Sequence, residues 1–231
     1  VDTSQKPAEI LIYEDIGKDP WDDSGIGAKD FVENLKTITG NGEVHLRVSS
    51  RGGNVWDGLA IYNAIDRLPN KVIAFIDGLA ASTASWIPLA ADEIHMPENA
   101  MIMIHDPFSM AYGTSDDMRK AADALDKTKS IIVNIYATST GQDEKTIMDA
   151  MAAETWYTAK DAKAFGFCNT VLPAVQMQNS FDLSKFRCVP KQLAGSIQNS
   201  AGKLNGQREN QMDKAKILAL LNKHGVTADA S

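Results

Sequence analysis

The sequence has few cysteines, no excess of positive charge and no long apolar run, and each of these scarcities narrows the classes of protein it can belong to. Two cysteines occur, Cys168 and Cys188, without the spacing of metal ligands, which fits a reducing compartment and leaves room for one disulfide at most. The net charge of −7 gives no indication of nucleic-acid binding. No apolar run approaches the ~18 residues of a membrane span, and residues 1–7 lack the core of a signal peptide. We therefore expect a cytoplasmic protein with neither nucleic acid nor membrane as a partner.

The remaining composition predicts one main domain followed by a polar tail. Hydrophobic residues make up 44% of the 231 residues, which is ordinary for a globular protein. Strand-like and helix-like segments alternate to about residue 172, a pattern typical of an α/β domain with largely parallel strands. The predicted organisation is a flexible lead over 1–8, the domain over 9–189, a polar linker over 190–211, and a short amphipathic helix over 212–231 that would begin a scaffold-like region.

The spacing of apolar residues places the individual elements. Strands are predicted over 9–13, 44–48, 71–76, 93–96, 101–104 and 167–172. Helices are predicted over 27–37, 55–67, 83–90, 115–138 and 143–151, with a short one after residue 158. Pro88 is expected to kink or shorten the helix over 83–90, because proline lacks a backbone N–H and clashes with the preceding turn.

One stretch has the composition of a turn that presents a nucleophile. Small residues connect the strand over 71–76 to the helix over 83–90, with Ser82 at the apex and Gly78 expected to permit a tight turn. The N–H of Thr83 would then point to where an oxyanion forms. On this stretch alone, an ordinary turn serine is the commoner explanation.

Three other segments supply the remaining parts of an acyl-transfer site. His105 follows the apolar strand over 101–104, Glu154 precedes a Thr-Trp-Tyr run, and Gly52 and Gly53 lie at another strand-to-helix turn. Acyl transfer needs a nucleophile, an imidazole base, a carboxylate that orients the base, and fixed hydrogen-bond donors for the oxyanion. These residue types match that set of requirements.

Taken in order, these segments resemble the motifs of the Clp-type serine peptidases. The similarity extends over about residues 9–172, and five motifs in the family's order carry it. The matching segments are Ser49–Val55, Asp57–Tyr62, Gly78–Ser82, Met103–Pro107 and Thr158–Gly166.

The resemblance implies a ClpP/crotonase-like α/β fold of repeated β-β-α units, with a long protruding helix after Ser115. It also implies a serine endopeptidase that acts on peptides or proteins as a homo-oligomeric ring and needs no metal or other cofactor. Carried over position by position, the resemblance implies that Ser82 is the nucleophile, His105 the base and Glu154 the acid. It implies that the N–H groups of Gly53 and Thr83 bind the oxyanion. The substrate-binding residues that it implies are Gly52, Asn54 and Val55. Glu154 replaces the family's usual aspartate, and Arg51 replaces its usual proline and adds a charge beside the cleft.

More narrowly, the chain resembles the Clp-related head maturation (prohead) proteases of tailed phages. The segments that carry this similarity are Ile12–Gly17, Gly78–Ser82, Pro97–Pro107 and Ala153–Ala159. This narrower resemblance implies a capsid or scaffold protein as substrate, processed during phage head assembly in the host cytoplasm. Self-cleavage within 190–211 is a further hypothesis, because that segment has a polar, loop-like composition.

Several alternatives remain open from the sequence. Asp149 and Asp106 are rivals to Glu154 as the acid, although Asp106 is poorly placed to orient the ring of its own neighbour, His105. A crotonase-like acyl-CoA enzyme would use paired N–H groups without a Ser–His pair. A non-catalytic scaffold or capsid-assembly protein could keep the fold, and a Ser–Lys peptidase would not need His105.

Overall fold

The computed structural model describes residues 7–174 and 182–190. The predicted helix over 212–231 lies outside the described residues, as do positions 1–6 of the predicted lead and 191–211 of the predicted linker. Within the described ranges, the protein has the predicted mixture of strands and helices. No helix of these ranges is long and apolar enough to cross a membrane.

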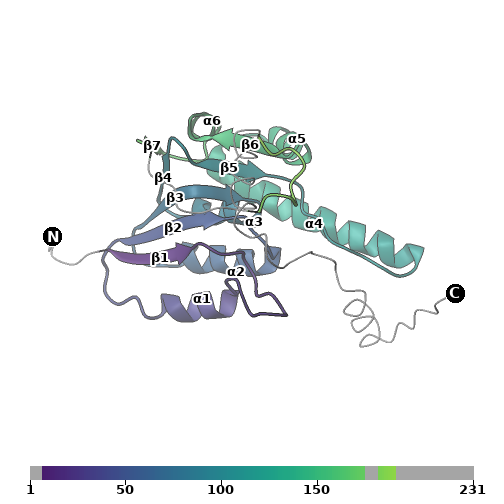
Figure 1. Cartoon of the computed structure of the whole chain (residues 1–231), viewed down its shortest axis with the longest axis horizontal. Coiled ribbons are helices and arrows are strands. Elements are labelled where there is room, and N and C mark those ends of the chain that lie inside the picture. The colour runs from purple at the N-terminus through teal and green to yellow at the C-terminus, as the bar shows by residue number, and fades with distance from the viewer. Residues whose placement is uncertain (1–6, 175–181, 191–231) are drawn as a thin grey trace, which may run out of the picture.

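A mixed sheet organises the described part of the chain (Figure 1). Five strands follow the order β1-β2-β3-β4-β7, and β5 pairs with β3 and with β6. All pairings are parallel except that of β5 with β6. The strands are β1 (Ala8–Ile12), β2 (Val44–Ser50), β3 (Val72–Ala81), β4 (Glu93–Pro97), β5 (Met101–Ile104), β6 (Thr155–Thr158) and β7 (Thr170–Leu172).

The helices connect these strands, and one of them is much longer than the rest. Helix α4 has 26 residues and extends well past the sheet in Figure 1, as the predicted protruding helix should. A capping box between Thr114 and Asp117 starts it, and Gly141 in the left-handed conformation ends it. The helices are α1 (Ala28–Leu35), α2 (Val55–Asp66), α3 (Thr83–Trp86), the 3-10 helix η1 (Ile87–Ala90), α4 (Ser115–Thr140), α5 (Glu144–Ala152) and α6 (Ala159–Phe165).

Two local predictions, on β3 and β6, were wrong, and the one on Pro88 was confirmed. Strand β3 does not stop at residue 76 but continues to Ala81, so Gly78 lies inside a strand and makes no turn. Strand β6 was not predicted, because its four residues give too short a pattern. The helix over 83–90 is a single α-helical turn followed by a 3-10 turn that contains Pro88, which is the shortening that proline was expected to cause.

The extension of β3 positions the candidate site. Its first half pairs with β4 at residues 73–75, and its last residues pair with β5 at residues 79–81. The register between β2 and β3 shifts between Val48 and Ser50, a bulge that re-aims the end of β2. The ends of β2, β3 and β5 therefore converge on one edge of the sheet.

The end of β3 has an apolar cluster on each of its two faces. The main core includes Ala80, Ile102 and Ile104 on one face. On the other face, Leu79, Ala81 and Met103 pack against Leu183 and Phe186, which come from the last described segment of the chain. Residues far along the sequence thus cover one face of the end of β3, next to Ser82.

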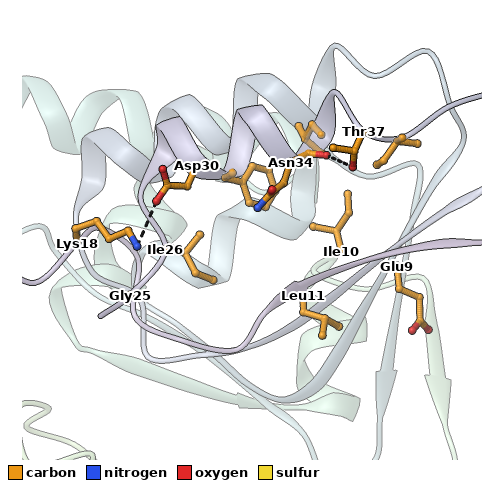
Figure 2. Close-up of a pocket in the computed structure, with 12 residues that line it drawn as sticks. Glu9, Ile10, Leu11, Lys18, Gly25, Ile26, Asp30, Asn34 and Thr37 are labelled. Atoms are coloured by element: carbon orange, nitrogen blue, oxygen red, sulfur yellow. Dashed lines mark hydrogen bonds and ion pairs between the residues drawn. The ribbon is translucent and has the colours of Figure 1, made fainter. Parts of the chain in front are cut away.

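A separate hollow of about 510 Å³ lies between β1 and α1 (Figure 2). Ile10, Ile26 and Phe31 line its apolar part, and Lys18 and Asp30 form an ion pair of 3.2 Å at one side. None of the predicted site residues lines it. The candidate site therefore lies at the convergent strand ends, apart from this hollow.

Candidate active site

Ser82 lies at the junction of β3 and α3 in an unusual backbone conformation. Its φ of 56° and ψ of −127° are strained for a residue with a side chain, a state that costs about 1–3 kcal/mol. The N–H of Ser82 donates to the carbonyl of Met103 at 2.9 Å, and its own carbonyl accepts from the N–H of Ser85 at 2.9 Å. This sharp strand-to-helix turn is the geometry that presents a nucleophilic serine.

Ser85 stabilises this turn from within the core. Its side chain is buried, and its hydroxyl donates to the carbonyl of Ser82 at 2.5 Å and also contacts the Tyr136 hydroxyl at 2.5 Å. Burial raises the pKa of Tyr136 far above its ordinary value, so this phenol stays protonated and can donate to Ser85. Ser85 is therefore a packed support of the turn.

The glycine pair after β2 lies directly against the Ser82 turn. A Cβ on Gly52 would be 2.5 Å from the carbonyl oxygen of Ala81 and 2.7 Å from the nitrogen of Thr83, so only glycine fits there. The Thr83 hydroxyl donates to the carbonyl of Gly53 at 2.9 Å. The two predicted oxyanion donors, the N–H groups of Gly53 and Thr83, thus belong to adjacent, mutually bonded segments.

His105, at the end of β5, meets Ser82. The ring Nε2 lies 2.7 Å from the Ser82 hydroxyl oxygen, within hydrogen-bond distance. Burial lowers the pKa of His105 below its ordinary value, while the charge of Glu154 raises it. The imidazole is therefore neutral at pH 7, the state that can accept a proton from a hydroxyl.

Glu154 is buried, with a side chain that has two backbone partners. Its carboxylate accepts the N–H of Arg187 at 2.9 Å and the N–H of Cys188 at 2.5 Å. Burial raises the pKa of this carboxyl most, but the two backbone N–H bonds, the Trp156 side chain and the charge of His105 together lower it more, so the net shift is downward. Glu154 thus remains an anion close enough to act on the His105 ring through its charge.

The two rival carboxylates have other partners. Asp149 forms an ion pair with Lys145 at 2.5 Å on the exposed side of α5. Asp106 forms an ion pair with Lys129 at 2.8 Å, and its charge also raises the pKa of His105. The charge of Glu154 raises the pKa of His105 more than the charge of Asp106 does, and Glu154 is the more deeply buried of these two residues.

The residues predicted to flank the substrate have structural contacts as well. Asn54 caps α2, because its side chain accepts the N–H groups of Trp56 and Asp57. Val55 is the first residue of α2, so of the three predicted substrate-binding residues it lies in a helix, whereas Asn54 before it is extended. Arg51 donates to both carboxylate oxygens of Asp15, at 2.7 and 3.1 Å.

The sequence analysis missed the contribution of residues 182–190. Arg187 and Cys188 donate to Glu154, and the Phe186 ring meets the His105 ring edge-on with centroids 5.8 Å apart. No motif in this segment signals these contacts, since two of them use backbone N–H groups that every non-proline residue has. Within the described ranges, no group of three acidic, histidine or cysteine side chains could hold a metal ion.

Comparison with known proteins finds a matching family profile and similar proteins. A family profile described as Clp protease matches residues 27–175. ATP-dependent Clp protease proteolytic subunit 1 of Streptomyces avermitilis is 35% identical over 136 residues, which are 58% of this chain and 62% of that protein. The ATP-dependent Clp protease proteolytic subunit of Ligilactobacillus salivarius is 32% identical over 133 residues, 56% of this chain and 67% of that protein.

A solved structure supports the fold. A mutant of ClpP1 from Listeria monocytogenes superposes with a TM-score of 0.63 at 24% identity, covering 71% of this chain and 91% of that chain. The predicted ClpP-like α/β fold is therefore confirmed. The match to the Streptomyces subunit spans less than two thirds of that protein's length.

Proposed function

Because the chain belongs to the Clp protease family, we propose that it is a serine endopeptidase that uses Ser82, His105 and Glu154. The observation that carries the proposal is the 2.7 Å contact between the Ser82 hydroxyl and the His105 Nε2. Ser82 directly follows β3 and His105 directly follows β5, and the hydroxyl and imidazole have the separation that proton transfer requires.

In the acylation step, the Ser82 oxygen attacks the carbonyl carbon of the scissile peptide bond. His105 takes the hydroxyl proton, and the N–H groups of Gly53 and Thr83 stabilise the negative oxygen that forms. Glu154 stabilises the resulting imidazolium through its charge. The tetrahedral intermediate then collapses, the C–N bond breaks, and His105 gives its proton to the leaving amine.

In the deacylation step, water replaces the departed amine. His105 removes a proton from this water, which attacks the ester carbon of the acyl-enzyme. Breakdown of the second tetrahedral intermediate releases the carboxylic acid, and the proton returns to the Ser82 oxygen. The chemistry of both steps needs no metal, nucleotide or other cofactor.

A fluorophosphonate probe and a protein substrate test this proposal together. We expect the probe to form one covalent adduct at Ser82, and Ser82→Ala to lose both the adduct and cleavage of casein. Ser109→Ala is the matched control, because Ser109 is an exposed serine after β5 that contacts neither His105 nor Glu154. A parent protein without adduct and without cleavage would contradict the proposal.

The same experiment separates the rival functions. A crotonase-like acyl-CoA enzyme would not be labelled at Ser82, and a non-catalytic scaffold would show neither labelling nor cleavage. A Ser–Lys peptidase would keep activity in His105→Ala. Lys129 is engaged with Asp106, which argues against this lysine as the base.

The narrower part of the proposal is a head maturation protease that cleaves capsid or scaffold protein in the host cytoplasm and assembles as a homo-oligomeric ring. The motifs over 12–17, 97–107 and 153–159 support it, whereas the relatives compared above are bacterial proteolytic subunits. Exposed Met118 and Ile131 on α4 offer apolar surface for association. Cleavage of purified capsid and scaffold proteins tests the proposed substrate. Sedimentation analysis of the parent protein tests the proposed ring.

A further inference from the structure

A short segment of the chain, residues 182–190, runs beside the candidate active site, and we call it the strap. It is anchored by apolar packing: Leu183 and Phe186 are buried against Leu79, Ala81 and Met103. The guanidinium of Arg51 donates to the carbonyl of Asp182 at 2.9 Å, which fixes the start of the strap next to the glycine turn.

We propose that the strap completes the active site by holding both the acid Glu154 and the base His105 in place. This inference rests on the proposed peptidase function, and it assigns a positioning role to Phe186 and to the backbone N–H groups of Arg187 and Cys188. None of these groups needs to touch the substrate.

On the acid side, the strap supplies two backbone hydrogen bonds to the carboxylate. Glu154 is 3% exposed and follows α5 at a φ of 51°, so its side chain enters the site from a strained backbone position. Its carboxylate then accepts one strap N–H at each oxygen, from Arg187 and Cys188. A buried carboxylate without such donors would tend to take up a proton, because burial disfavours the charged form.

On the base side, the strap supplies one of two rings that contact the imidazole. The Phe186 ring lies 5.8 Å from the His105 ring at an interplanar angle of 82°, and the Phe108 ring lies 5.7 Å away at 65°. Phe186 is buried, whereas Phe108 is 72% exposed. Phe186 also meets the Trp156 ring at 5.7 Å, so it is wedged between the histidine and the strand that follows Glu154.

Charges from three elements act on the same imidazole. Glu154 and Asp106 raise the pKa of His105, whereas Lys185 and Arg187 of the strap lower it, and burial lowers it most. The strap therefore contributes to the proton affinity of the base in two opposed ways. It brings its own positive charges, and it holds the Glu154 anion in place.

A pair of substitutions at one position isolates the backbone contact. Cys188→Pro removes the N–H that Glu154 accepts, while Cys188→Ala keeps it, and both variants lose the same exposed thiol. In Cys188→Pro we expect kcat for a peptide substrate to fall about tenfold relative to Cys188→Ala, the effect of losing one hydrogen bond to a charged group. KM should change by less than twofold, because the strap N–H does not bind substrate.

Titration of His105 gives a readout that does not depend on activity. With NMR of labelled histidine, assigned by the loss of its signal in His105→Gln, we expect a lower His105 pKa in Cys188→Pro than in Cys188→Ala. The reason is that a released Glu154 carboxylate no longer holds its charge beside the ring. Equal titration curves and equal kcat in the two variants would overturn the proposal, and a higher kcat in Cys188→Pro would show that the strap restrains the acid.

A second pair covers the case in which Cys188→Pro fails to fold. Phe186→Ala should lower kcat about fivefold and broaden the NMR signal of His105, whereas Tyr112→Ala, which removes an exposed ring from the loop after β5, should leave both near the parent values. Equal effects of the two substitutions would overturn the role of the strap. If the parent protein does not react with fluorophosphonate, the proposed function fails, yet the titrations still decide whether the strap positions His105 and Glu154.

Discussion

Ser82 and Glu154 share an unusual backbone conformation but differ in what fixes their functional groups. Both have side chains and a positive φ, 56° for Ser82 and 51° for Glu154, and each lies at a junction between a strand and a helix. Such conformations persist only where the surroundings enforce them, at a cost of about 1–3 kcal/mol each. The difference lies in which part of the chain fixes the functional group that each residue contributes.

The Ser82 turn is enforced by the core of the domain. Gly52 packs against its backbone, and the Ser85 hydroxyl bonds to its carbonyl, with Tyr136 behind. The Glu154 carboxylate is instead held by the strap, more than thirty residues further along the chain. The nucleophile should therefore keep its geometry whenever the domain is folded, whereas the acid also requires the strap to be docked.

The largest expected effect comes from crowding the nucleophile side. Gly52→Ala would place a Cβ 2.5 Å from the Ala81 oxygen and 2.7 Å from the Thr83 nitrogen, displacing the serine and an oxyanion donor together. We expect kcat/KM to fall at least about 10³-fold, since the loss of one oxyanion donor alone costs about 10²–10³-fold. Peptide cleavage kinetics and the rate of fluorophosphonate labelling measure this loss.

Gly40→Ala provides the control for backbone strain. Gly40 has nearly the same φ, 85° against 84° for Gly52, but nothing lies within 4 Å of its added Cβ. Its substitution should cost about 1–2 kcal/mol of stability and leave kcat/KM unchanged. Similar losses of activity in the two variants would mean that close packing of Gly52 against the turn is not what holds Ser82.

Neutralising the acid should have the next largest effect. Glu154→Gln removes the charge, and its amide can accept from one strap N–H only, so we expect kcat to fall about 10²-fold. This is less than the ~10⁴-fold loss for a triad acid bonded directly to its histidine, because Glu154 acts on the ring here through its charge. The acid limb of the kcat/KM profile should move to lower pH, because the charge that raises the His105 pKa is gone.

Asp149→Asn is the matched control for this prediction. Asp149 is paired with Lys145 on the surface of α5. Its substitution should therefore change neither kcat nor the pH profile beyond the error of measurement. If Asp149→Asn caused the larger loss instead, the rival acid considered from the sequence would be the correct one.

The same contrast explains which parts of the site the sequence could predict. Ser82, His105 and the glycine pair stand in short motifs, where local sequence determines local geometry, and the structure brings all of them together. Glu154 could be chosen only by position, because a lone glutamate before a strand has no distinctive pattern. The strap could not be predicted, since its contacts use backbone N–H groups and apolar packing over long sequence distance.

The fold shows the same limit. Long periodic segments such as α4 were predicted to within two residues at each end. The extent of β3 was not, because Gly78 and the alanines after it have low strand propensity, and pairing with β5 and, at Ala80, with Ser50 of β2 keeps them in the sheet. Tertiary contacts therefore decided both the length of the strand that carries Ser82 and the placement of the acid.

A smaller effect is expected from weakening the support inside the core. Ser85→Ala removes the bond to the Ser82 carbonyl and leaves the buried Tyr136 hydroxyl without that partner, which should cost about 1–3 kcal/mol in the free energy of unfolding. We expect kcat to fall about tenfold, measured beside urea unfolding. Ser130→Ala, which removes an exposed helical hydroxyl bonded to the Asp126 carbonyl, should change neither quantity appreciably.

The smallest effect should come from Arg51, which contacts both regions. Its guanidinium bonds to Asp15 near the glycine turn and to the Asp182 carbonyl at the start of the strap, but it contacts neither Ser82 nor Glu154. Arg51→Ala should change kcat and KM by no more than about fivefold, because a partly exposed ion pair contributes about 0.2–1 kcal/mol. The exposed pair of Arg119 with Asp116 makes Arg119→Ala the control, with no expected change in KM. A larger fall in kcat together with a shift of the His105 titration in Arg51→Ala would show that the glycine turn and the strap are energetically coupled, and that nucleophile and acid are not held independently.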